Sequence, residues 1–118
     1  MPSSVPINEK EIKSFYDRKK DEVPFEKWKS KQESTVRKII DRGLLKVKKG
    51  NYGDFKHLGG GVIELRFRDG YRIYFTEISK TIVLLFYGGD KSDQQKDIDK
   101  AREYRKILSE KGLDYCLK

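Results

Sequence analysis

One continuous stretch, residues 59–91, most constrains the fold, because apolar and polar residues alternate along it. It reads GGGVIELRFRDGYRIYFTEISKTIVLLFYGGDK. Successive residues of a strand point to opposite faces of a sheet. The pattern therefore predicts three consecutive strands, with an apolar stripe on one face and two arginines and a tyrosine on the other.

The turn between the first two of these strands fixes their register. A two-residue turn at Asp69-Gly70 would place apolar residues opposite arginines. A three-residue turn at residues 68–70 keeps the faces separate, with Gly70 in the left-handed conformation that such a turn requires. It pairs Phe67 with Tyr71, Leu65 with Ile73 and Ile63 with Phe75.

This register sets Arg66 directly opposite Arg72, and Glu64 opposite Tyr74. Like charges directly opposite one another are unfavourable. One interpretation is a site that receives an anion between the arginines. The other is a solvated face on which Glu64 bridges diagonally to Arg72, and the charge pattern alone favours neither.

Length and charge limit the function classes. The chain of 118 residues predicts a single domain over residues 1–118, with a flexible tail at residues 1–7. A net charge of +8 favours a polyanionic partner, either nucleic acid or an acidic protein. The single cysteine, Cys116, excludes an internal disulfide framework. Without an apolar run of membrane-spanning length or a signal peptide, a cytoplasmic location is expected.

The remaining segments suggest helices around this sheet. Residues 9–18 are compatible with a short helix, but we favour a strand at the sheet edge. Pro24 suits the first position of a helix, and residues 35–48 carry apolar residues at helical spacing, which predicts two helices over one sheet face. Residues 81–87 are almost continuously apolar and predict a strand buried on both faces.

The C-terminal part begins after the Gly-Gly pair at residues 88–89. Ser92 and Gln95 form the signature of a capping box, which predicts the start of a helix. Apolar residues on one side continue this helix until Gly112.

Four motifs in series resemble those of a known family. They are G-N-Y-G-D-x-K at residues 50–56, G-x-x-E-L-R at 61–66, G-Y-R-I-Y-F at 70–75 and G-G-D-K-S-x-Q-x-x-D-I-x-x-A at 88–101. Together they resemble the addiction-module killer proteins, the HigB-like and phage-derived Gp49-like toxins of the RelE/ParE superfamily. The resemblance covers about residues 12–108 in unbroken order.

The resemblance implies an α+β fold of the RelE type, with two N-terminal helices on a twisted, mainly antiparallel sheet and a C-terminal helix. It also implies a type II toxin whose partner is an antitoxin with a helix-turn-helix domain. RelE-like members cleave messenger RNA on the ribosome without a metal or another cofactor, whereas ParE-like members poison DNA gyrase. The fold alone does not decide between these activities.

The resemblance also implies site residues. Arg72 lies where RelE-like nucleases keep a phosphate-binding arginine, and Arg66 where they carry a second basic residue. Lys91 lies at the place of another basic or histidine catalytic residue, and Lys56 at the basic position before the sheet. The histidine that several relatives carry near the end of the last strand is missing, which leaves the general acid open.

Cleavage of RNA by its own 2′-hydroxyl needs a base, cations at the phosphate and an acid for the leaving oxygen. Arg66 and Arg72 are expected to clamp the phosphate, and Lys91 to stabilise or protonate the leaving group. Glu64 and Asp54 are the candidate bases, although a salt bridge and a turn are their more ordinary roles.

Two aromatic side chains complete the set of candidate RNA-binding residues. Tyr74 lies on the arginine face and is a candidate to stack on a base or to bind a phosphate, although packing is the commoner role. His57 is the only histidine, a residue type that often serves as a general acid or base, although a lone histidine beside a glycine loop is more often incidental.

Overall fold

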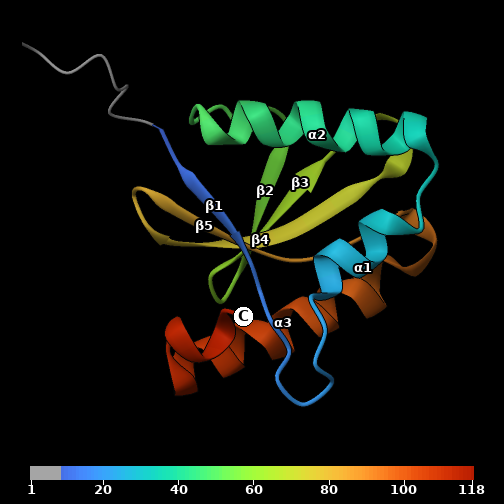
Figure 1. Ribbon diagram of the computed structural model, residues 1–118. Coiled ribbons are helices and arrows are strands. Elements are labelled where there is room, and N and C mark those ends of the chain that lie inside the picture. Colours follow the sequence, from blue (N-terminus) through green and yellow to red (C-terminus); the bar gives the residue numbers. More distant parts are fainter. Residues whose placement is uncertain (1–8) are drawn as a thin grey trace, which may run out of the picture.

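The protein is built around one five-stranded sheet with helices on both sides, as Figure 1 shows for the computed structural model. The structure describes residues 9–118, so the tail expected at residues 1–7 lies outside the described residues. The strands in this range are β1 (Glu11–Ser14), β2 (Phe55–Gly59), β3 (Val62–Arg66), β4 (Arg72–Ser79) and β5 (Ile82–Gly89). The α-helices in this range are α1 (Pro24–Ser30), α2 (Ser34–Lys48) and α3 (Gln94–Lys111). The described elements form an α+β fold.

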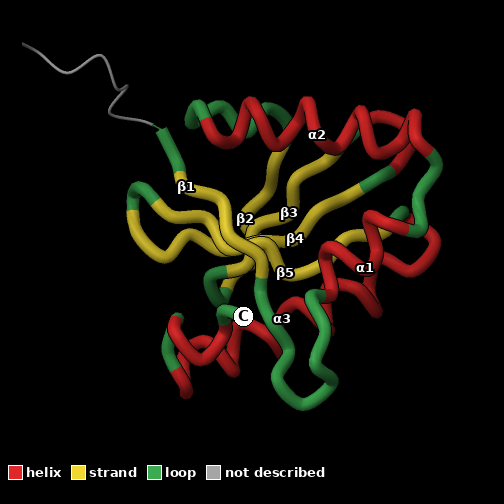
Figure 2. Tube along the Cα trace, in the orientation of Figure 1, coloured by secondary structure: helices red, strands yellow, loops and turns green. Residues whose placement is uncertain are grey.

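The strand order is β1-β5-β4-β3-β2, so the N-terminal strand lies beside the last one (Figure 2). β1 runs parallel to β5, whereas the other neighbouring strands pair antiparallel, and the sheet is therefore mixed. β1 confirms the strand expected within residues 9–18. β2 goes beyond the sequence prediction, which has no strand at residues 55–58.

The predicted register between β3 and β4 is confirmed. Leu65 lies opposite Ile73, and Arg66 lies opposite Arg72. The backbone N–H of Phe67 donates to the carbonyl of Tyr71 at 2.8 Å, which closes the three-residue turn. Within this turn Gly70 has a φ of 83°, and Asp69 before it also has a positive φ, of 65°.

Both faces of the sheet are covered, which rules out the interpretation of the arginine face as a solvated one. Figure 1 shows α2 along one face and α3 along the other. On the α2 face, residues of α1, α2 and the three strands β3, β4 and β5 form one core: Phe25, Ile40, Val47, Ile63, Leu65, Ile73, Phe75, Val83 and Leu85. On the α3 face, Tyr74 and Glu64 are completely buried. The polar alternation therefore marks a second buried layer.

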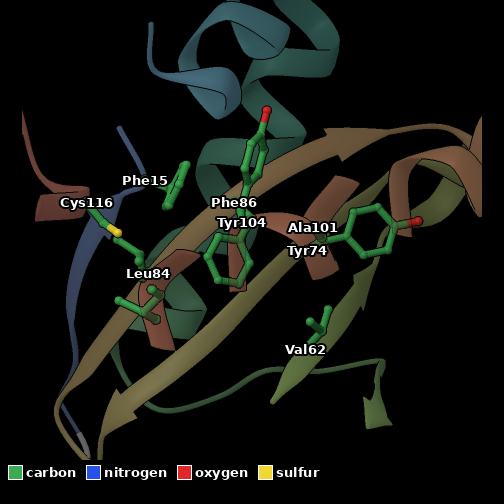
Figure 3. Packing of buried hydrophobic residues seen from close by; sticks show 9 residues of the cluster. Phe15, Val62, Tyr74, Leu84, Phe86, Ala101, Tyr104 and Cys116 are labelled. Carbon is green, nitrogen blue, oxygen red and sulfur yellow. The ribbon is translucent and has the colours of Figure 1, made fainter. Parts of the chain in front are cut away.

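Aromatic stacking forms the core beneath α3. The ring of Phe15 stacks on that of Tyr104 with centroids 4.5 Å apart, and Phe86 lies edge-on to Phe15. Cys116 closes the same cluster and is completely buried, and this burial raises the pKa of its thiol. Figure 3 shows the Tyr74 hydroxyl directed away from the Phe15 and Cys116 side of the cluster.

α3 begins differently from the sequence prediction. The prediction of a capping box at Ser92 and Gln95 is wrong, because Asp90 supplies the capping oxygen. The backbone N–H of Ser92 donates to Asp90 at 2.9 Å, and the Gln95 side chain donates to Asp99 instead. A short 3-10 turn separates this cap from α3.

Helix boundaries and burial follow the sequence more closely elsewhere. α1 begins at Pro24, as expected, and residues 83–86 of β5 are buried on both faces. α3 ends directly before Gly112. None of the helices in residues 9–118 combines the length and the apolar character needed to cross a bilayer.

Gly43 lets α2 approach the end of β3 closely. A Cβ atom at this position would lie 2.0 Å from Cε1 of Phe67, so the ring packs directly against the helix backbone. This contact explains a glycine inside a helix, where it costs about 1 kcal/mol relative to alanine.

Replacing Gly43 by alanine should lower the free energy of unfolding by about 1–3 kcal/mol, because the new methyl group overpacks against Phe67. Urea unfolding followed by circular dichroism measures this change. Lys38→Ala, on the exposed surface of the same helix, is the control and should be nearly neutral. Combining Gly43→Ala with Phe67→Leu should give less than the sum of the two losses. A Gly43→Ala variant as stable as the wild type would contradict the close packing of Phe67 on the helix.

Candidate functional site

Three basic side chains predicted from the sequence gather at one end of the sheet, where β3 ends, β4 begins and β5 ends. Arg66 and Arg72 are cross-strand neighbours, and Arg72 lies opposite Gly89 at the end of β5. Lys91 follows two residues later and folds over the β3–β4 turn. A Cβ atom at Gly70 would lie 3.0 Å from Cγ and Cε of this lysine.

A buried carboxylate holds the two arginines together. The Nε of Arg66 donates to Oε1 of Glu64 at 2.9 Å, and the Nε of Arg72 lies 3.7 Å from Oε2. The side-chain amide of Gln94, at the start of α3, also donates to Oε2 at 2.9 Å. The diagonal bridge considered from the sequence is therefore present, but it joins both arginines and lies under a helix instead of in solvent.

These contacts keep Glu64 ionised. Burial by itself would raise the pKa of this carboxyl group, but the hydrogen bonds from Arg66 and Gln94 and the charge of Arg72 hold it below its usual value. Glu64 is also completely inaccessible to solvent. The role of general base expected for Glu64 does not fit this environment, because the group neither binds a proton readily nor reaches a substrate.

Asp54 and Lys56 lie on the accessible side of the same cluster. The backbone N–H of Arg66 donates to the carbonyl of Asp54 at 2.9 Å, and Lys56 lies opposite Glu64 across β2 and β3. Both side chains are exposed. Asp54 and Arg66 line the same groove, so Asp54 remains a candidate base.

His57 and Tyr74 do not join the accessible site. His57 lies opposite Ile63, so it belongs to the α2 face, where its ring is 5.7 Å from that of Phe55. Tyr74 is completely buried, and its hydroxyl has no hydrogen-bond partner among the described residues. The expected stacking of Tyr74 on an RNA base does not fit this burial.

Two polar residues of α3 that border the arginine cluster were not predicted from the sequence. They are Gln94, which holds Glu64, and Asp97, which is 8% exposed. A Cβ atom at Gly89 would lie 1.9 Å from Oδ2 of Asp97, so the carboxylate rests on the strand backbone. Asp97 precedes the buried Ala101 by four residues, and Tyr104 follows three residues later, so all three lie on the same side of α3. This spacing could have indicated that Asp97 is buried.

Burial, followed by the charges of Asp93 and Asp90, raises the pKa of Asp97 to about 6. The pKa of Tyr74, on the same face of the sheet, is also raised, first by burial and then by the charge of Glu64. Among the described residues, no three His, Cys, Asp or Glu side chains gather closely enough to hold a metal ion.

Replacing Glu64 by glutamine should lower the free energy of unfolding by up to about 3 kcal/mol at pH 7, because two partly buried arginines lose their counter-charge. The folded-state pKa of Glu64 lies below the usual value of 4.5, so its contribution is present above that pH and disappears on acidification. The difference between wild type and variant, measured by urea unfolding, should therefore shrink below pH 4.5. A difference that does not depend on pH would contradict the ion-pair role.

Replacing Asp97 by asparagine should have the opposite pH dependence. The raised folded-state pKa means that the native state holds a proton that the unfolded chain releases, so wild-type stability falls between pH 3.8 and about 6. Relative to the wild type, the variant should gain on the order of 1–3 kcal/mol from pH 4 to pH 7. Thermal and urea unfolding at both pH values measure this gain. The same change in the free energy of unfolding with pH in both proteins would exclude it.

Comparison with known proteins identifies a relative. A protein of Haemophilus influenzae, described as an uncharacterized protein, is 37% identical to this chain over 83 residues. The aligned part covers 68% of this chain and 84% of the H. influenzae protein. No protein-family model matches the chain, and no solved structure matches it. Identity at this level over most of the length of both proteins shows common descent. The chain therefore belongs to the same family as the uncharacterized H. influenzae protein.

Proposed function

We propose that this protein is the toxin of a type II toxin–antitoxin module and a metal-free endoribonuclease that cleaves messenger RNA on the ribosome. The proposal includes the finer fold description, a RelE-like arrangement of helices and sheet. It also includes a cytoplasmic location and a cognate antitoxin with a helix-turn-helix domain. The four motifs in series, with their spacing over residues 50–101, support this assignment.

The observation that carries the proposal is the cation cluster at the end of the sheet. Arg66 and Arg72 are neighbours across two strands, and Lys91 lies over the adjoining turn. Because Glu64 offsets one of the two guanidinium charges, the cluster with Lys91 keeps a net positive charge. Guanidinium groups fixed by a carboxylate can donate in parallel to phosphate oxygens without reorganising first.

The proposed reaction uses the RNA's own 2′-hydroxyl as the nucleophile. Asp54 accepts the proton of this hydroxyl while the 2′-oxygen bonds to the adjacent phosphorus. Arg66 and Arg72 stabilise the negative charge that builds up on the phosphate oxygens. The bond to the 5′-oxygen breaks, Lys91 donates a proton to that oxygen, and the products are a 2′,3′-cyclic phosphate and a 5′-hydroxyl end.

Arg72→Lys and Lys91→Gln should each lower RNA cleavage by about 100-fold or more, because each removes a donor to the developing charge. Lysine at position 72 keeps the charge beside Glu64, so a loss of activity reflects the lost bidentate geometry more than unfolding. Growth arrest after induction, together with primer extension for new 5′ ends on messenger RNA, measures the effect.

Lys80→Gln is the matched control, because this exposed lysine lies in the β4–β5 turn at the far end of β4 from Arg72. It should leave growth arrest unchanged. Full toxicity in both Arg72→Lys and Lys91→Gln would refute the proposed nuclease site.

A non-catalytic inhibitor of the same fold, such as a gyrase poison, is the second candidate. One observation favours it: of the carboxylates and the histidine expected near the arginines, Glu64 is buried in ion pairs and His57 lies on the α2 face. A gyrase poison would arrest growth without new 5′ ends on messenger RNA and would trap gyrase on cleaved DNA. The same primer-extension experiment therefore separates the two functions.

A further inference from the structure

A groove of about 390 Å³ is lined by α2 and the end of β3, next to the arginine cluster. One stripe of α2 forms its first wall, through Ile39, Arg42, Gly43 and Lys46. These residues recur at helical spacing, so they all point to the same side of the helix. The opposite wall is the stretch Leu65–Arg68, and the loop at residues 52–54 closes one side.

The groove carries positive charge on both walls. Arg42 and Lys46 come from α2, whereas Arg66 and Arg68 come from the end of β3 and its turn. Among the described residues, Arg42, Lys46 and Arg68 are exposed and form no ion pair with a carboxylate. Asp54 is the one acidic residue that lines the groove in the described part of the chain. An anion is therefore favoured between these walls.

The floor of the groove is apolar and partly aromatic. Ile39, Leu65 and Phe67 contribute to it, and Tyr52 lies at one side. The ring of Phe67 lies against the backbone of Gly43, so the helix offers no side chain there. A flat, uncharged group fits such a surface, while the charges attached to that group meet the cations of the walls.

The groove is continuous with the proposed catalytic cluster. Arg66 lines the groove and also donates to Glu64, which pairs with Arg72. Arg68 belongs to the turn over which Lys91 folds. A polymer with one negative charge on each repeating unit can thus extend from the arginine cluster into the groove and remain on a positively charged surface.

We propose that this groove holds the single-stranded RNA nucleotides that adjoin the cleaved phosphate. A base lies on the apolar floor, and the neighbouring phosphates bind Arg42 and Lys46 on one wall and Arg68 on the other. This inference rests on the proposed function, because it takes RNA as the substrate. An acidic protein segment would meet the same charges. The continuity with the phosphate-binding arginines favours the RNA, since phosphates repeat along that path and carboxylates of a peptide need not.

The test measures binding of a short, fluorescein-labelled, 2′-O-methylated single-stranded RNA to the full chain by fluorescence anisotropy. The 2′-O-methyl groups block cleavage, so the readout is binding alone. Arg42→Gln combined with Lys46→Gln should weaken binding at least tenfold. It should also reduce the slope of log K against log salt by about 1.4, as expected for two lost phosphate contacts on single strands.

Lys48→Gln combined with Lys80→Gln is the matched control. It removes the same charge, and Lys48 lies on the same helix as Lys46 but about 160° away from it around the axis. This control should bind the RNA within about threefold of wild type, because long-range effects of exposed charges are screened by salt. Equal losses in the two double variants would mean that net charge alone drives binding, and would overturn the groove site.

A second measurement locates the bound base. RNA with 4-thiouridine beside the blocked phosphate should crosslink on irradiation to peptides that contain Tyr52 or Phe67. Arg42→Gln with Lys46→Gln should abolish this crosslink, and crosslinks confined to other peptides would overturn the site.

The outcomes separate the groove from the proposed function. If the RNA binds the wild type, depends on Arg72 and ignores Arg42 and Lys46, then the groove site fails while the nuclease proposal stands. If the RNA does not bind the wild type at all, the groove site fails, while growth arrest with new 5′ ends on messenger RNA decides the nuclease proposal separately. An acidic amphipathic peptide that binds through Arg42 and Lys46, while RNA binding is unaffected, would assign the groove to a protein partner and overturn the RNA proposal.

Discussion

The packing of α3 on the sheet and the position of the arginine pair depend on the contacts of the buried Glu64 carboxylate. It connects β3, β4 and the start of α3 through Arg66, Arg72 and Gln94. Two arginines opposite one another on adjacent strands would otherwise repel each other in a partly dehydrated layer. Glu64 turns this repulsion into a fixed pair of guanidinium groups. Their orientation is therefore set before any ligand arrives, which is the condition under which charged groups stabilise a transition state most effectively.

The same interaction explains how a sheet with a polar pattern can be covered on both faces. A charged group is tolerated in a buried layer only when partners satisfy it. Glu64 has three such partners, whereas Asp97 has no counter-charge of comparable strength nearby, and its pKa rises accordingly. The layer beneath α3 thus holds one carboxylate that stays charged and another that titrates near neutrality. This contrast arises from their surroundings, since both are carboxylic acids of similar intrinsic strength.

Much of the sheet could be predicted from the sequence, and the reason is local. The register between β3 and β4 follows from the turn at residues 68–70, because shifting it by one residue would exchange the two faces. The pairing of Arg66 with Arg72 followed directly, and the long apolar run identified β5 as a strand buried on both sides. These features depend on residues that are close together in the chain.

What escaped prediction depends on contacts between distant segments. No local pattern indicates that α3 covers the face of Glu64 and Tyr74, so a solvated face stayed open as one of two interpretations. β2 is a short edge strand with mostly exposed side chains, and its pattern lacks an apolar period. The groove beside α2 needs both the helix stripe around Gly43 and the ring of Phe67, which lie on different elements and meet only in the folded chain.

The parallel edge formed by β1 and β5 has a consequence for the order of folding. Lys10, just before β1, bonds to the carbonyl of Lys80, which is 70 residues further along the chain. The hairpins from β2 to β5 close short loops, whereas β1 must wait until β5 exists before it finds its partner. On a translating ribosome, β1 emerges before the other described strands and is thus the last of them to join the sheet. Until then the β5 edge is unpaired, and it is the natural place for intermolecular strand pairing in incomplete chains.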